Sequence, residues 1–278
     1  MGRLKTPRVA DRCGSLDAAT PQGRVPSPVW IPDTMNLNPL RRAAGLAACM
    51  LAASLGAAEL PAPLAEAVTR LSGGPAYAYT WETQMPGAPF AVAPMKGWAA
   101  PGGAALVEAT ADRKSVKVAT LGSRRAVRLA ADWKTPSEAD PGKGAVGVEV
   151  ARLLALPAPH EHLAALLAGA AAFRLERDGS YRAELDANVA AAILTANVEG
   201  RAPGGFTPEI RDATASVRVW LSGGALWRYV TTTSARLALP FGTKDIQSIS
   251  TVELREIPAA EAALPPDALV VLRARARP

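Results

Sequence analysis

The two histidines of the chain stand two residues apart, in His160-Glu161-His162. Two imidazoles can hold a metal ion, and an imidazole beside a carboxylate can act as a general base. On a helix, however, side chains at positions i and i+2 point about 200° apart and cannot bind one metal ion together. The sequence shows no obvious third ligand. We therefore expect no metal site, and interpret these residues as the polar start of a helix that follows Pro159.

Other catalytic patterns are weaker still. The glycine pairs lack the Lys-Ser/Thr of a phosphate-binding loop, and no G-x-S-x-G motif presents a serine to a base. Carboxylates such as Glu82 and Asp132 would support glycoside hydrolysis only if the fold brought them together. We predict no catalytic residues, no cofactor and no enzymatic activity, with a carboxylate-dependent envelope hydrolase as the more distant alternative.

The N-terminal region carries an export signal. Arg41 and Arg42 precede sixteen uncharged residues, Ala43–Ala58, and this order is typical of a secretory signal peptide. We predict that residues 35–58 are the signal peptide, cleaved after Ala58. Residues 1–34 are expected to be a disordered extension or the product of a misplaced start codon. The apolar run is shorter than the roughly 20 residues that span a bilayer.

A second interpretation of this region is lipid anchoring. Leu46-Ala47-Ala48-Cys49 matches a lipobox, but only six apolar residues separate Arg42 from Cys49. We therefore favour cleavage after Ala58 and export to the periplasm or cell envelope. The mature domain then has no cysteine, and so neither a disulfide nor a thiolate metal site.

The net charge of +6 is concentrated before the mature domain. After residue 58 the chain has 24 basic and 22 acidic residues, a net charge of about +2. Nucleic-acid-binding proteins usually show a clustered basic face with interleaved aromatic residues. The densest basic cluster is interpreted as a solvated strand face, and no nucleic-acid partner is expected; it contains Arg113, Lys114, Lys117, Arg124, Arg125 and Arg128.

Alternating side chains predict a mostly antiparallel β structure with a helical middle. In Tyr77–Met85 large apolar residues alternate with polar ones, as in a half-buried strand. Asp178-Gly179 predicts a type I′ hairpin turn. Further strands are expected at Phe90–Trp98, Ala105–Ala111, Ser115–Leu121, Arg125–Trp133, Phe173–Arg177, Ser180–Leu185, Ser216–Leu221, Ala225–Leu239, Gln247–Glu256 and Val270–Arg273. Helices are expected at Ala58–Ser72, Val148–Leu156, His160–Ala171 and Asp186–Ala196.

This order of elements predicts one β-rich domain, residues 59–278. Its fold class is α+β, with a curved antiparallel sheet and helices packed on one face. Large strand residues either fill the core or line an apolar cavity for a ligand. We assign the predicted ligand-binding set to Tyr77, Tyr79, Trp81, Val127, Leu129, Trp133, Phe173, Leu175, Tyr181, Val217 and Val219.

Several segments resemble a set of uncharacterised exported bacterial proteins, whose layout is similar to the LolA/LppX type of periplasmic lipoprotein-carrier fold. The resemblance covers roughly 150 of the 220 residues that follow the predicted cleavage point. Its motifs are Trp133-Lys134-Thr135-Pro136, Arg152–Pro159, Asp178-Gly179-Ser180-Tyr181, Ser216–Trp220 with Gly224-Ala225-Leu226, Arg228-Tyr229, Ser250–Leu254 and Pro266-Asp267-Ala268. The resemblance implies an open half-barrel capped by helices and able to hold acyl chains.

The leading hypothesis is a non-enzymatic envelope protein that binds a lipid or lipid-modified partner in an apolar cavity, with peripheral or transient membrane contact. The first alternative is the same fold with a filled core, serving as an interaction or structural domain. The identity of the ligand and the oligomeric state stay open at this stage.

Overall fold

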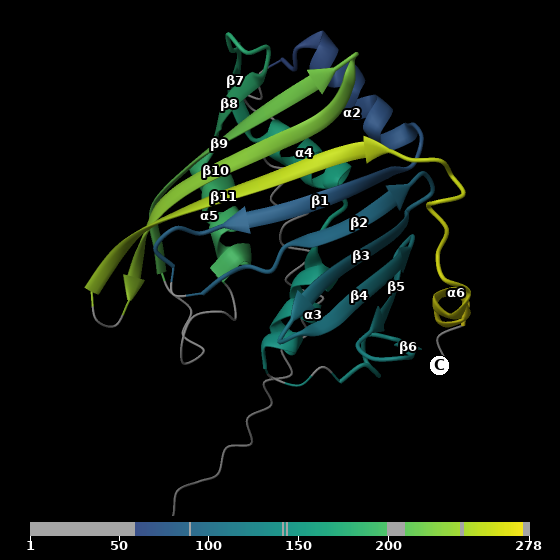
Figure 1. Cartoon of the computed structure of the whole chain (residues 1–278). Helices are drawn as coiled ribbons and strands as arrows, with labels where there is room; N and C mark the ends of the chain where they lie inside the picture. Colours follow the sequence, from purple (N-terminus) through teal and green to yellow (C-terminus); the bar gives the residue numbers. More distant parts are fainter. Residues whose placement is uncertain are drawn as a thin grey trace, which may run out of the picture. The chain divides into compact units, whose positions relative to one another are not determined.

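The computed structural model describes residues 59–274, with gaps at 89, 141, 143, 199–208 and 240–241. The predicted signal peptide and the extension before it lie outside these residues. The described strands form one 11-stranded sheet, ordered β6-β5-β4-β3-β2-β1-β11-β10-β9-β8-β7 (Figure 1). They are β1 Tyr77–Gln84, β2 Met95–Ala100, β3 Ala104–Ala111, β4 Lys114–Leu121, β5 Arg124–Arg128, β6 Trp133–Lys134, β7 Ala170–Leu175, β8 Tyr181–Leu185, β9 Glu209–Ser222, β10 Ala225–Leu239 and β11 Gly242–Glu256.

All strand pairs are antiparallel, and the sheet ends at β6 and β7 without closing. The predicted α+β class with a large open antiparallel sheet is therefore confirmed. Local turn chemistry explains much of the pairing. Gly223 and Gly224 both have positive φ, 57° and 77°, as a tight turn between β9 and β10 requires.

The turn at Asp178-Gly179 differs from the predicted type I′ turn, because only Gly179 has positive φ. Residues 176–180 form a longer connection, in which the Glu176 amide donates to the Ser180 carbonyl. The Asp178 carboxylate accepts hydrogen bonds from the Ser180 amide and hydroxyl. This side chain shapes the loop, so two positive φ angles are not needed.

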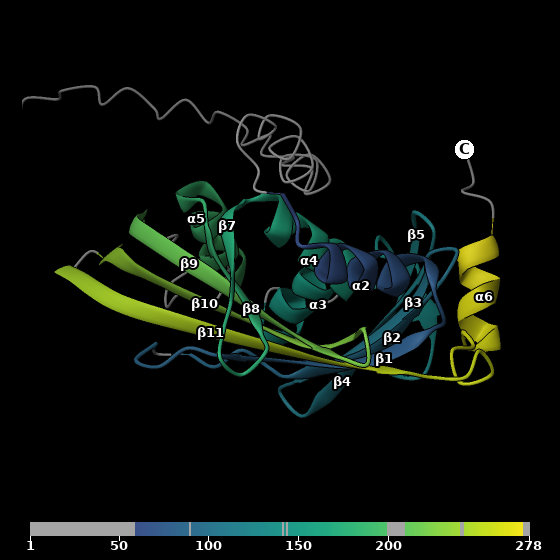
Figure 2. The same ribbon diagram turned by 90° about the horizontal axis from the view of Figure 1, so that it is seen from above.

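Four helices cover one face of the sheet. They are α2 Ala62–Gly73, α3 Ala145–Ala155, α4 Pro159–Ala168 and α5 Ala187–Val198, and they lie behind the sheet in Figure 1 and on one side of it in Figure 2. Tyr77, Tyr79 and Trp81 of β1 are buried on this side, in one core with Leu64 of α2 and Leu163 of α4. We call it the inner face, and the opposite side the outer face.

The fifth described helix, α6 Pro266–Arg273, packs elsewhere. Its Ala268 and Leu272 are buried in a second core with Trp98, Ala119 and other residues. The strand residues of this core alternate along their strands with inner-face residues, so they lie on the outer face. The segment Val270–Arg273, predicted as a strand, is thus helical, because Pro265 and Pro266 start a helix there. The expectation of helices on one face holds for α2–α5 and is wrong for α6.

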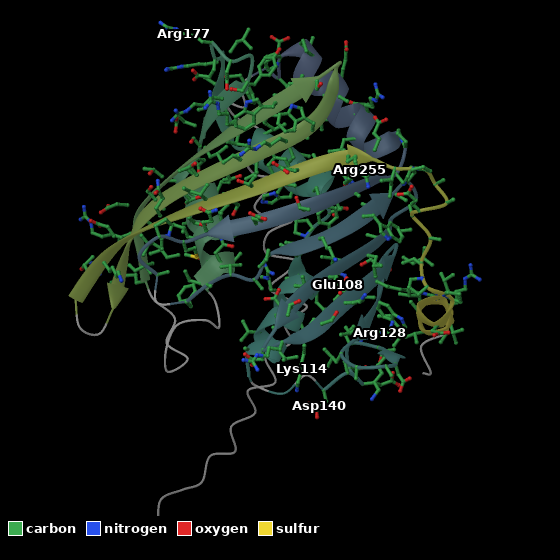
Figure 3. The ribbon with its side chains drawn as sticks, viewed as in Figure 1. Glu108, Lys114, Arg128, Asp140, Arg177 and Arg255 are labelled. Carbon is green, nitrogen blue, oxygen red and sulfur yellow. The ribbon has the colours of Figure 1, made fainter. Side chains whose placement is uncertain are left out.

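The outer face away from α6 is polar. Cross-strand partners place Lys96 beside Glu108, Glu108 beside Lys117, and Lys117 beside Arg128. Glu108 and Arg128 lie on the face that is turned toward the viewer in Figure 3. Lys117 and Glu108 form an ion pair of 3.3 Å. The apolar and polar sides of the sheet are therefore clearly separated.

Among the described residues, the helices are too short or too polar to cross a membrane.

Candidate functional site on the inner face of the sheet

A row of aromatic and aliphatic residues crosses the centre of the inner face. Trp81 of β1 is the direct partner of Val252 on β11, which in turn is the direct partner of Tyr229 on β10. Tyr229 is the direct partner of Val219 on β9. Val219 in turn faces Tyr181 on β8. We call these five residues the aromatic row. Its central members are completely enclosed, because Val252 and Tyr229 have no exposed surface.

Helix α4 lies over this row and carries both histidines. The helix begins at Pro159, whose missing N–H is tolerated in the first turn. The Glu161 carboxylate accepts a hydrogen bond from the Ala158 amide at 3.0 Å, which caps the same turn. His160 and His162 therefore lie in the first turn of α4, next to the sheet.

Each histidine lies within hydrogen-bond distance of a tyrosine on a different strand. The Nδ1 atom of His160 lies 2.6 Å from the Tyr77 hydroxyl oxygen on β1. The Nδ1 atom of His162 lies 3.0 Å from the Tyr229 hydroxyl oxygen on β10, and its ring centroid is 4.6 Å from that of Trp81. The predicted start of a helix is present, but these side chains face the core and do not point into solvent. Buried tyrosine hydroxyls need hydrogen-bond partners, and this requirement was the signal in the sequence that could have placed them.

This cluster is uncharged at neutral pH. Burial lowers the pKa of His162 to about 4 and also lowers the pKa of His160. Burial raises the pKa values of Tyr77, Tyr79 and Tyr229 well above the ordinary tyrosine value. The cluster therefore combines apolar surface with neutral hydrogen-bonding groups.

A small pocket opens between α2 and the ends of the central strands. Its volume is about 20 Å³, enough for about one water molecule. An exposed ion pair between Arg70 and Glu256, 2.8 Å long, lies at this pocket. Its lining consists of Ala67, Arg70, Leu71, Pro75, Tyr77, Ala225, Leu226, Leu254 and Glu256.

The fold brings most of the predicted ligand-binding residues together. Six are buried in the core between the inner face and the helices, namely Tyr77, Tyr79, Trp81, Val127, Val217 and Val219. Three more are partly buried against the same core, namely Leu129, Phe173 and Tyr181. The remaining two, Trp133 and Leu175, lie elsewhere.

Trp133 belongs to the second core, beside α6. The predicted strand Arg125–Trp133 is interrupted, because residues 129–132 bend and the chain returns antiparallel as β6. Trp133 becomes the direct partner of Arg128 and shares its outer-face side. A continuous strand Arg125–Trp133 would place Val127 and Trp133 on one face, and this expectation is therefore wrong. Leu175, near the end of the edge strand β7, is 68% exposed.

The carboxylates considered for hydrolysis lie apart. Glu82 is exposed on β1, and Asp132 is exposed in the bend before β6. Strands β2 to β5 lie between β1 and β6, so five spacings of about 4.8 Å separate them by roughly 24 Å. This pair cannot act on one glycosidic bond. Within residues 59–274, leaving the gaps aside, no three His, Cys, Asp or Glu side chains cluster as metal ligands would.

The basic cluster of the sequence is likewise divided by the fold. Lys117 and Arg128 lie on the outer face, whereas Arg125 alternates with them and lies on the inner-face side. Arg124 donates a 2.9 Å hydrogen bond to the Leu272 carbonyl of α6. The six residues therefore do not form one continuous basic surface.

No protein-family model matches the chain, and no curated protein matches it. Among solved structures, the chain is similar to a LolA superfamily protein from Nitrosomonas europaea. The two are 12% identical, over 73% of this chain and 96% of the other, with a TM-score of 0.26. A similarity this low establishes neither the function nor a ligand.

Proposed function

We propose that this chain is a non-enzymatic protein of the cell envelope that binds a lipid or a lipid-modified partner between the inner face and helices α2–α5. The observation that carries this proposal is that the helical layer consists of four short, separate helices. Short separate helices cover the aromatic row, and each fully buries few side chains. In α2 these are Leu64 and Ala67, and in α5 they are Ala190, Leu194 and Val198.

Displacement of one such helix costs little compared with what an acyl chain contributes. Exposing a buried leucine costs about 1.5–3 kcal/mol, and each methylene transferred from water contributes about 0.8 kcal/mol. Ten methylenes laid on the inner face would thus contribute about 8 kcal/mol. This amount exceeds the cost of uncovering Leu64 and Ala67, the two fully buried side chains of α2. The partly buried Val68 and Leu71 and the cost of association reduce this margin.

The chain around α2 is suited to such a movement. Gly73 ends the helix, and Gly74, Pro75 and Ala76 connect it to β1. The pocket beside the Arg70–Glu256 ion pair already separates part of α2 from the strand ends. Because this ion pair is exposed, it contributes at most about 1 kcal/mol to closure.

A second candidate is an interaction or structural domain with a filled core. The size of the pocket favours it: 20 Å³ is far below the roughly 150 Å³ of a cavity that holds benzene. The two candidates differ in whether an acyl chain can open the helical layer, and a binding experiment separates them.

The test is a titration of the purified protein with a fluorescent fatty acid. We expect saturable binding with a micromolar Kd. Leu226 lines the pocket and is 6% exposed, so Leu226→Glu should weaken binding at least tenfold. Leu175→Glu is the matched control, because Leu175 is exposed and Glu at this position should leave the affinity unchanged.

Circular dichroism of both variants would show whether they fold. Absence of saturable binding to the wild-type protein would reject the lipid hypothesis and favour the interaction domain. Equal affinity of folded Leu226→Glu and wild type would place the ligand away from the inner face.

A further inference from the structure

A band of hydroxyl side chains crosses the inner face next to the aromatic row. Thr83 of β1 is the direct partner of Ser250 on β11, and Ser250 is the direct partner of Thr231 on β10. In the next row, Ser248 is the partner of Thr233. We call these five residues the hydroxyl band. All five are buried, and Thr231, Thr233 and Ser248 are at most 1% exposed.

The band separates two apolar parts of the same face. On one side lies the aromatic row, with Trp81, Val252 and Tyr229 each two residues away along its strand. On the other side Ile246 and Ala235 are partners in the next inner-face row and belong to a third core with Leu194 and Val198 of α5. A polar strip thus lies in the middle of an otherwise apolar surface.

Two members of the band lack hydrogen-bond partners. The Thr83 and Ser250 hydroxyls lie 3.0 Å apart and satisfy each other, and Asn197 of α5 donates to the Ser248 hydroxyl at 3.1 Å. The hydroxyl oxygens of Thr231 and Thr233 are buried without a partner. Such groups are costly and rare in folded proteins. Thr231 and Thr233 are two residues apart on one strand, about 7 Å, so one ligand can reach both.

We propose that the hydroxyl band binds the neutral ester or amide group of an acylated ligand, with Thr231 donating to its carbonyl oxygen and Thr233 to a neighbouring oxygen of the same ligand. This inference rests on the proposed function and specifies its ligand class. A hydroxyl donates readily to a carbonyl. The band contains no cation that would stabilise a carboxylate, whose removal from water is far more costly than that of an ester. Acyl esters and amides should therefore bind in preference to free fatty acids.

The apolar surfaces on both sides of the band fit such a ligand. An acyl chain lies along the aromatic row, and the polar group at its end meets Thr231 and Thr233. Helix α5 covers the band through Asn197 and its neighbours Leu194 and Val198. Entry of the ester therefore requires α5 to shift together with the helices over the aromatic row.

The test uses three ligands. Diphenylhexatriene, a fluorescent hydrocarbon without a carbonyl, reports occupation of the apolar surface. A monoacylglycerol and the fatty acid of the same chain length then compete with it at neutral pH, below their micelle concentrations. With wild-type protein we expect the monoacylglycerol to displace the probe at concentrations at least tenfold lower than the fatty acid.

The variants remove only the hydroxyls. Thr231→Val with Thr233→Val keeps the branched shape of both side chains and should reduce the ester preference at least fivefold, with unchanged affinity for the hydrocarbon. The melting temperature of the ligand-free double variant should rise by a few degrees, because two unpartnered hydroxyls are gone. Thr232→Val is the matched control: Thr232 lies between them on β10 and faces the outer side.

The outcomes separate this inference from the proposed function. If wild-type protein fails to bind the hydrocarbon probe, both are rejected. If it binds the probe but shows no ester preference, or the same preference in the double variant, only the role of the hydroxyl band is rejected. A lower melting temperature of the double variant would show that the hydroxyls already have partners, and would also reject that role.

Discussion

His162 packs against two aromatic side chains, and this position decides its chemistry. Its ring lies 4.6 Å from Trp81 and its Nδ1 atom 3.0 Å from the Tyr229 hydroxyl. Charging an imidazole in these surroundings is unfavourable because the packed neighbours remove much of the water around the ring. The neutral residue therefore forms a hydrogen-bonding contact between α4 and the sheet. Because protonation of its ring is unfavourable in the folded state, the stability of the fold depends on pH.

Stability should fall as the pH is lowered from about 6.5 toward 4. The unfolded chain binds a proton to His162 near its ordinary pKa of about 6.5, whereas the folded chain does so only near pH 4. In this window the unfolded state binds more protons, so acid favours unfolding. The shift corresponds to at most about 3 kcal/mol, and His160, whose pKa is also lowered, adds in the same direction.

Urea unfolding of wild type and His162→Gln at pH 7 and pH 4.5 measures this effect. Glutamine keeps a hydrogen-bonding group near Tyr229 and does not titrate. The loss of stability on acidification should be smaller in the variant. Equal losses in the two proteins would show that His162 is not the group responsible.

At the scale of elements, β2 is adapted to the aromatic side chains of β1. Gly97 is the direct partner of Tyr79. A Cβ atom at Gly97 would collide with the Leu106 carbonyl oxygen and lie 2.8 Å from the Tyr79 hydroxyl oxygen. The missing side chain thus makes room for a buried phenol.

Gly97→Ala should therefore destabilise the protein by about 1–3 kcal/mol through overpacking. Gly73→Ala is a matched control, because a Cβ there has no atom within 4 Å. At this position, the last of α2, alanine should be neutral or stabilise by up to about 1 kcal/mol. Chemical denaturation measures both, and similar effects at the two positions would contradict the close packing of Tyr79.

At the scale of the whole molecule, α6 gives the sheet a second apolar contact. It encloses Trp98 and Trp133 on the outer face, on the opposite side from α2–α5. The C-terminal helix is thus absent from the layer that covers the proposed ligand site. Movement of α2 or α5 would leave the contacts of α6 intact.

Export is the prediction that concerns the chain as a whole. Mass spectrometry of the protein recovered from a bacterial periplasmic fraction should give Glu59 as its first residue. Cys49→Ala should leave this processing unchanged, because cleavage after Ala58 does not use the thiol. Loss of processing in Cys49→Ala would indicate lipidation at Cys49, and an unprocessed chain in the cytosol would reject export.

Local sequence was sufficient for several features of the fold. Alternation in Tyr77–Gln84 placed Tyr77, Tyr79 and Trp81 on one buried face, because side chains along a strand alternate whatever lies around it. The Gly223-Gly224 turn and the starts of α3 and α4 depend on nearby residues only, and they too were predictable to within a few positions.

Tertiary structure decided which side chains meet. The bend at residues 129–132 placed Trp133 on the outer face. The position of β7 at the edge of the sheet left Leu175 exposed. Helix α4 brought His160 and His162 to tyrosines on different strands. The hydroxyl band likewise exists only because β1, β11 and β10 pair in this register. Side-chain alternation is a local property of a strand, whereas register, and the identity of the covering helix, depend on packing between segments far apart in the sequence.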